Sequence, residues 1–99
     1  MFIVITSQNK RTITPHAGKC RKFWRYELSG KEIIGKQLIE AEKEDTFSQS
    51  GLILDSLRPM DILVTAGMGD RLREKLSNIG VHVMVTQETT PDDFMKSLG

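Results

Sequence analysis

The chain has 99 residues, of which 38% are hydrophobic and 27% charged, and its formal net charge is +1. This length and composition predict one globular domain over residues 1–99 and exclude collagen-like, coiled-coil and disordered classes. Charge is nevertheless uneven, because six of the 14 basic residues precede Glu27, the first of the 13 acidic residues. We therefore expect an anionic ligand to meet the N-terminal part of the chain.

The single cysteine excludes an internal disulfide and is typical of a reducing compartment. No apolar run approaches the ~18 residues of a membrane span. The short apolar run at residues 2–5 lacks the length and basic flank of a signal peptide. These features predict a cytoplasmic protein with no membrane partner.

The N-terminal half predicts three strands. Residues 2–6 are apolar and β-branched, which favours a buried strand. Side chains then alternate from 20 to 28, so that Cys20 is expected to share a face with Trp24, and Phe23 the wetter face with Arg25. A turn over residues 29–31 leads back into an edge strand over residues 33–39, and the three strands form a meander.

The C-terminal half changes to a helical period. Thr46 and Gln49 have the spacing of a capping box and predict a helix that runs to Leu57, because Pro59 prevents its continuation. The remaining expected elements are a central strand at residues 60–66, a helix that Asp70 caps and Gly80 ends, a strand at 81–85, and a last helix that begins at Pro91.

This order predicts an α/β fold with a five-stranded mixed sheet, strand order 3-2-1-4-5, and helices on both faces. Strands one and four then become neighbours, and the crevice beyond their carboxyl ends is where such sheets bind ligands. Two loops end there, one with His16 and one with Gly67. We expect these two residues to lie within about 15 Å of each other, the scale of a small ligand pocket.

His16 and Cys20 are the candidate metal ligands. They stand four positions apart among basic residues, and imidazole and thiolate suit iron and other transition metals. The pair falls short of a closed four-ligand site but fits an open one that a cofactor completes. Two structural interpretations remain open: His16 as an ordinary loop histidine and Cys20 as a small core residue.

The Gly67-Met68-Gly69 turn is a second candidate. It is not a dinucleotide fingerprint, because Leu72 replaces the third glycine. It is either a tight strand-to-helix turn or an anion site made of backbone N–H groups, and Asp70 would compete for those groups as N-cap.

Nucleic acid is not an expected partner. Trp24 and Tyr26 alternate with Arg25, so their rings and the arginine are expected on opposite faces of one strand. Stacking platforms expose their rings, whereas these rings are better explained as core.

The run Ile62-Leu63-Val64-Thr65-Ala66-Gly67-Met68-Gly69, followed by Leu72, Leu76 and Gly80-Val81, resembles the signature of the dinitrogenase iron–molybdenum cofactor biosynthesis family, which includes NifX, NafY and the C-terminal domain of NifB. His16-Ala17-Gly18 and the aromatic strand after it agree with that family. The resemblance implies a ribonuclease H-like fold without nuclease chemistry. It also implies binding of iron–sulfur or iron–molybdenum clusters in transit to nitrogenase.

The leading hypothesis is therefore a non-enzymatic carrier that holds such a cluster as cargo, with nitrogenase-assembly proteins as partners. The candidate cofactor-binding residues are His16, Gly18, Lys19, Arg21, Gly67, Met68 and Gly69, and the candidate metal ligands are His16 and Cys20. Two rivals remain: a thiol-based redox sensor or small enzyme that uses Cys20, and a protein-interaction module that uses the edge strand.

Overall fold

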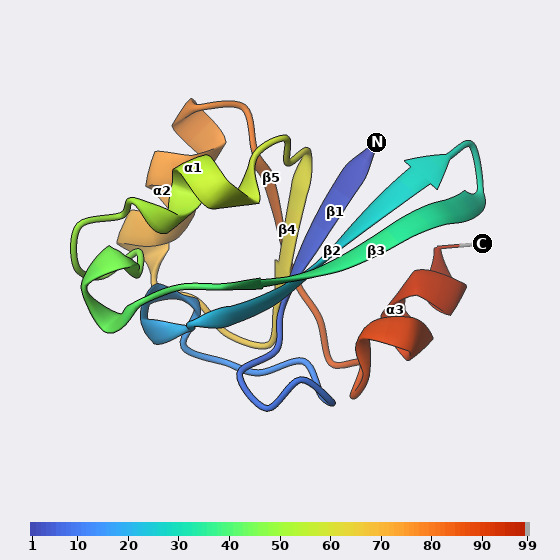
Figure 1. Ribbon diagram of the computed structural model, residues 1–99, viewed down its shortest axis with the longest axis horizontal. Helices are drawn as coiled ribbons and strands as arrows, with labels where there is room; N and C mark the ends of the chain where they lie inside the picture. Colours follow the sequence, from blue (N-terminus) through green and yellow to red (C-terminus); the bar gives the residue numbers. More distant parts are fainter. Residues whose placement is uncertain (99) are drawn as a thin grey trace.

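The computed structural model describes residues 1–98, which form one five-stranded sheet with helices packed against it (Figure 1). The strands are β1 (Phe2–Thr6), β2 (Lys22–Ser29), β3 (Glu32–Glu40), β4 (Ile62–Thr65) and β5 (His82–Val85); the α-helices are α1 (Ile53–Leu57), α2 (Asp70–Asn78) and α3 (Pro91–Ser97); the short 3₁₀ helices are η1 (Ala17–Lys19) and η2 (Lys43–Asp45). The sheet order β3-β2-β1-β4-β5 confirms the predicted topology. β1, β2 and β3 pair antiparallel, whereas β4 is parallel to both β1 and β5.

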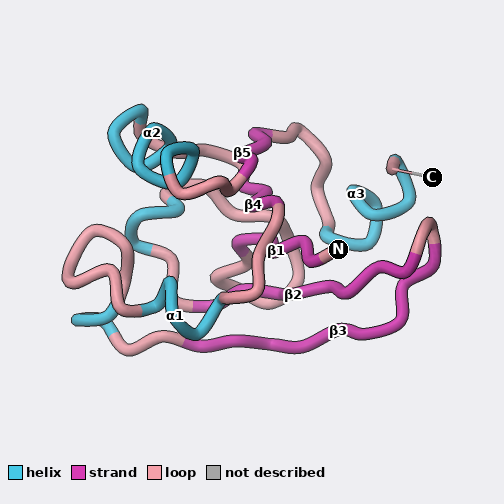
Figure 2. The backbone as a smooth tube through the Cα atoms, turned by 90° about the horizontal axis from the view of Figure 1, so that it is seen from above, coloured by secondary structure: helices cyan, strands magenta, loops and turns pink. Residues whose placement is uncertain are grey.

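The helices divide between the two faces of the sheet, as predicted. Helices α1 and α2 lie together at one side of the sheet and α3 lies at the other (Figures 1 and 2). One core cluster joins α1 and α2 to the sheet through Ile53, Leu57 and Leu76, and the other joins α3 through Phe94 and Met95. No helix within residues 1–98 is long and apolar enough to cross a membrane.

The central strands β1 and β4 are buried on both faces. Val4 and Leu63 point into the cluster under α1 and α2, whereas Ile5 and Val64 point into the cluster under α3. Because successive side chains of a strand alternate between faces, burial on both sides requires the nearly continuous apolar runs seen in the sequence.

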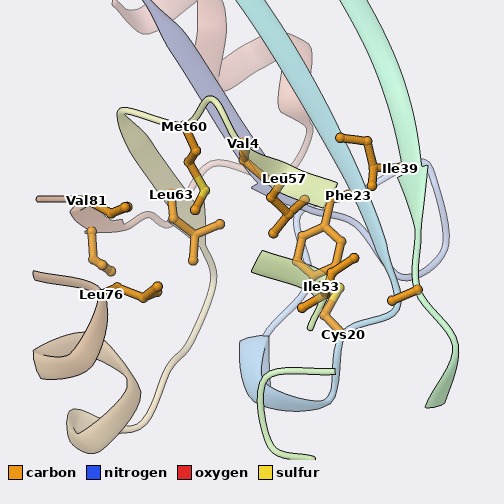
Figure 3. Packing of buried hydrophobic residues seen from close by; sticks show 12 residues of the cluster. Val4, Cys20, Phe23, Ile39, Ile53, Leu57, Met60, Leu63, Leu76 and Val81 are labelled. Carbon is orange, nitrogen blue, oxygen red and sulfur yellow. The ribbon is translucent and has the colours of Figure 1, made fainter. Parts of the chain in front are cut away.

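Cys20 departs from the prediction. It packs in the same cluster as Phe23 and Ile53 (Figure 3), whereas Trp24 packs on the opposite face of the sheet. Strand β2 begins at Lys22, so the strand alternation does not extend back to Cys20. The prediction that Phe23 lies on the more solvent-exposed face of its strand is also wrong, since Phe23 is fully buried.

The predicted helix from Thr46 to Leu57 is wrong over its first half. Thr46 follows η2, is buried, and its hydroxyl donates to the carbonyl of Lys43 rather than capping a helix. The chain next turns through Gly51, whose φ of +75° is left-handed and incompatible with a continuing α-helix. Only Ile53–Leu57 is α-helical.

The predicted start of α3 and the predicted stop of α2 are confirmed, whereas the predicted N-cap of α2 is wrong. Gly69, not Asp70, is the N-cap of α2, and Asp70 is the first helical residue without a side-chain capping bond. Gly80 has a φ of +88° just past the end of α2, as a left-handed stop requires. At α3 the hydroxyl of Thr90 accepts a hydrogen bond from the N–H of Asp93, with Pro91 in the first turn.

Candidate functional site

The candidate site lies where β1 and β4 end side by side. These strands are parallel, with Ile3 opposite Ile62 and Ile5 opposite Val64, so their carboxyl ends open on the same edge. After them the chain diverges into the loop of residues 7–21, which contains η1, and the turn of residues 66–69. This is the topological switch point of the sheet.

Two buried threonines connect the loop and the turn by hydrogen bonds. Thr6 and Thr65 end β1 and β4, each is fully buried, and their hydroxyl oxygens are 2.9 Å apart. The Thr6 hydroxyl is 2.7 Å from the carbonyl oxygen of Thr14. The Thr65 hydroxyl reaches the carbonyl oxygens of Thr14 and Gly67, each at 3.1 Å. Sequence analysis missed this pair, although a threonine closing each of two buried apolar strands was the available signal.

The two segments touch directly. The N–H of Ala17 donates to the carbonyl of Gly67 (3.2 Å), and the N–H of Ala66 donates to the carbonyl of Thr14 (3.3 Å). A Cβ atom on Gly67 would lie 3.2 Å from the Cβ of Pro15 and 4.0 Å from the backbone nitrogen of His16. The prediction that His16 and Gly67 lie within about 15 Å of each other is therefore confirmed, and their separation is far below that limit.

His16 is held in an uncommon conformation with its side chain in solvent. Its φ and ψ of 62° and 52° are left-handed, and its backbone begins η1 by accepting from the N–H of Lys19 (2.9 Å). The residue is exposed. A left-handed conformation costs a non-glycine residue of order 1–3 kcal/mol, which contacts with the surrounding structure must offset. Such residues cluster at ligand sites.

The Cys20 thiol is only 3% exposed and donates to the carbonyl of Lys22, with Sγ and oxygen 3.0 Å apart. Burial raises the pKa of this thiol, and the hydrogen bond to Lys22 opposes that shift only in part. Cys20 is therefore a protonated thiol at neutral pH, which is the opposite of an activated nucleophile.

An open pocket of about 350 Å³ brings His16, Lys19 and Cys20 together. The other described residues that line it are Gln8, Thr14 and Pro15, and none of these is acidic. Gln8 was not predicted; its side-chain oxygen accepts from the N–H of Arg21 (2.7 Å) and thereby ties the two ends of the loop.

The other predicted site residues lie outside this pocket. Arg21 lines a neighbouring hollow, where its Nε donates to the carbonyl of Ala41 and its guanidinium lies 3.9 Å from Glu42. Gly18 and Gly69 line a further hollow beside α2. Gly67 lies against Pro15, and Met68 packs against the core cluster of α1 and α2.

Within residues 1–98, no three histidine, cysteine, aspartate or glutamate side chains come close enough to form a metal site. His16 and Cys20 line one pocket but supply two ligands at most. Their role as metal ligands stays a prediction, and any metal there would need its remaining ligands from elsewhere.

Tyr26 lies in the core cluster under α3 and Trp24 packs partly buried against it, as predicted for core aromatic residues. Tyr26 is buried and donates its hydroxyl to Asp92 (3.1 Å); burial first, and then this carboxylate, raise the pKa of the phenol well above its usual value. The Trp24 ring lies under the Lys36 ammonium, which is 4.5 Å from the ring centroid. Arg25 donates to the carbonyls of Leu57 and Arg58, so part of the basic segment serves the fold.

A family model described as dinitrogenase iron-molybdenum cofactor matches residues 1–99. The uncharacterized protein MJ0580 of Methanocaldococcus jannaschii is 25% identical over 99 residues, covering 97% of this chain and 83% of that protein. The crystal structure of PH0822 superposes with a TM-score of 0.83 at 22% identity, covering 99% of this chain and 88% of the other. The NMR structure of a Thermotoga protein, TM1290, named as a candidate NifB protein, gives 0.75 at 16% identity over 98% and 85% of the chains. The two structural likenesses establish the fold alone.

Proposed function

Because the chain belongs to the dinitrogenase iron-molybdenum cofactor family, we propose that it is a cytoplasmic carrier that binds an iron–sulfur or iron–molybdenum cluster as cargo and catalyses no reaction. It would pass this cargo to nitrogenase-assembly proteins. The observation that carries the proposal is the pocket in which an exposed, left-handed His16 lies beside Lys19 and Cys20.

The pocket suits such a cargo in size and charge. Its volume of about 350 Å³ is within the range of small-ligand sites. Lys19 is the charged residue that lines it, and a cluster with thiolate or sulfide ligands is anionic. Charge attraction alone would not select a metal, so specificity falls to the imidazole of His16.

His16 would be the first anchor and Cys20 at most the second. The imidazole is exposed and can bind iron without a change in the fold. The thiol must first lose its proton and its hydrogen bond to Lys22, and its raised pKa opposes that loss. A carrier that must release its cargo is served by few protein ligands.

Anaerobic reconstitution with iron and sulfide tests the proposal. His16→Ala and His82→Ala form a matched pair, because both histidines are exposed while His82 lies on the edge strand β5. The expected result is loss of most bound iron and its visible absorption in His16→Ala, with full uptake in His82→Ala. Equal iron content in the two variants would remove His16 from the mechanism.

The rival interpretations differ in their support. A thiol sensor or enzyme at Cys20 is disfavoured, because burial raises the pKa of that thiol. An interaction module has one favouring observation, namely the half-exposed side chains of Ile33 and Ile34 on the edge strand β3. Failure of the unmodified protein to take up iron would favour that module.

A further inference from the structure

A second hollow, of about 380 Å³, lies between η1, the segment after η2 and the first turns of α2. It is lined by Gly18, Phe47, Ser48, Arg71, Leu72 and Lys75, together with the N-cap glycine of α2. It shares no lining residue with the pocket of His16. The proposed cluster ligands therefore leave its chemistry unexplained.

The charged side chains that line this hollow are both cationic. Arg71 and Lys75 are exposed and stand four residues apart, so they lie on one face of α2 and repel each other. The ion pairs found within residues 1–98 are Arg21 with Glu42 and Lys36 with Asp92, so neither cation of the hollow has a carboxylate partner in that part of the chain. None of the described residues that line the hollow is acidic. An anion placed between the two cations would relieve their repulsion.

Two large side chains, Phe47 and Leu72, give the hollow an apolar wall. Phe47 and Leu72 are partly buried and pack against the core cluster. The Phe47 ring meets the ring of Phe23 edge-on, with centroids 6.1 Å apart and planes at 88°. The N–H of Ser48 donates to the carbonyl of Gly18 (2.8 Å), which joins the two walls. Such a surface favours a ligand that carries a flat apolar group next to its negative charge.

We propose that this hollow is a second ligand site, for a small organic anion in which a carboxylate or phosphate is joined to an apolar group. Arg71 and Lys75 bind the anionic head, the Ser48 hydroxyl is within the lining to donate to it, and the apolar group lies against Phe47 and Leu72. The site does not depend on cluster binding, because it needs neither His16 nor Cys20.

Phenyl phosphate is a suitable probe in a ¹H–¹⁵N NMR titration of the cluster-free protein. The expected result is saturable shifts of the Gly18, Ser48 and Leu72 amides with a Kd on the order of 1 mM, as befits a ligand of this size. Inorganic phosphate and benzyl alcohol, which carry only one half of the probe each, should bind at least about tenfold more weakly. Comparing the affinity of benzoate with that of phenyl phosphate shows whether the site prefers a carboxylate or a phosphate. If neither compound binds, the proposal is overturned.

Three variants assign the binding to the hollow. Arg71→Gln and Lys75→Gln should each weaken the binding of phenyl phosphate about threefold to fivefold at low salt, as expected for an exposed charge contact. Arg73→Gln is the control, because Arg73 is an exposed cation of the same helix outside the hollow. Equal affinity in all three variants, or equal binding of phenyl phosphate and inorganic phosphate, would refute the site. His16→Ala should bind the probe normally, so the outcome is independent of the proposed carrier function.

Discussion

Replacing Gly67 by alanine tests how closely the two loops of the site approach. The new Cβ would lie 3.2 Å from the Cβ of Pro15, inside the ~3.5–4.0 Å of a favourable carbon contact. Pro15 cannot easily retreat, because hydrogen bonds hold the chain before and after it: the carbonyl of Thr14 accepts from the N–H of Ala66, and the N–H of Ala17 donates to the carbonyl of Gly67. Overpacking costs about 1–3 kcal/mol, and the lower entropy of the unfolded alanine chain offsets about 0.4–1 kcal/mol. We expect the free energy of unfolding to fall by about 1–2 kcal/mol.

Gly18→Ala, in the loop that Gly67 contacts, is the matched control. Its added Cβ would lie 3.6 Å from the Cβ of Ser48, an ordinary contact, and its φ is not left-handed. This variant should therefore keep or gain stability, by up to about 1 kcal/mol. Urea denaturation gives both free energies, and thermal unfolding should shift by about 4–8 °C for each kcal/mol in a domain of this size. Equal stability of the two variants would refute the close approach of Gly67 to Pro15.

Three further outcomes follow from the buried polar groups. Thr65→Val should lower the free energy of unfolding by about 1–2 kcal/mol, because it removes the hydroxyl that bonds Thr6 and both loops; Thr65→Ser should restore most of that loss, measured by the same denaturation. Tyr26 is the single tyrosine, so ultraviolet absorption follows its ionisation alone: in Asp92→Asn the phenol pKa should fall toward its usual value. Folding raises the pKa of the Tyr26 phenol, so the unfolded chain loses this proton first as pH rises. The contribution to the free energy of unfolding is therefore complete below the pKa of the unfolded chain and is lost as pH rises toward the pKa of the folded protein. In Asp92→Asn the free energy of unfolding should fall less steeply at alkaline pH, and an unchanged slope would contradict the assignment. Native Cys20 should react with iodoacetamide at neutral pH far more slowly than the same thiol in the urea-unfolded chain, and equal rates would show that it is not buried.

The position of the candidate site could be predicted because it depends on topology. Apolar runs at residues 2–6 and 60–66, joined through a meander and a helix, leave little choice but adjacent parallel strands. The loops after those strands must then meet, and His16 and Gly67 do so through the bond between Ala17 and Gly67. The chemical role of His16 is a separate matter, since geometry places a side chain without identifying its ligand.

The prediction failed where local signals were compatible with more than one structure. Thr46 and Gln49 have the spacing of a capping box, yet burial of Thr46 and the left-handed Gly51 delay α1 until Ile53. The face of Cys20 was assigned by extending a strand period beyond the first residue of β2. Both errors concern a side chain whose environment is set by distant segments.

The sequence by itself therefore determined the strand order and the two-sided core, because the period of its apolar residues and the handedness of crossovers depend on local chain geometry. Only the tertiary structure decided that Thr6 and Thr65 share a hydrogen-bonded pair under both loops, that His16 adopts a left-handed conformation, and that Cys20 is a protonated core thiol. These features arise from contacts between residues far apart in the chain, whose packing and desolvation no local pattern encodes.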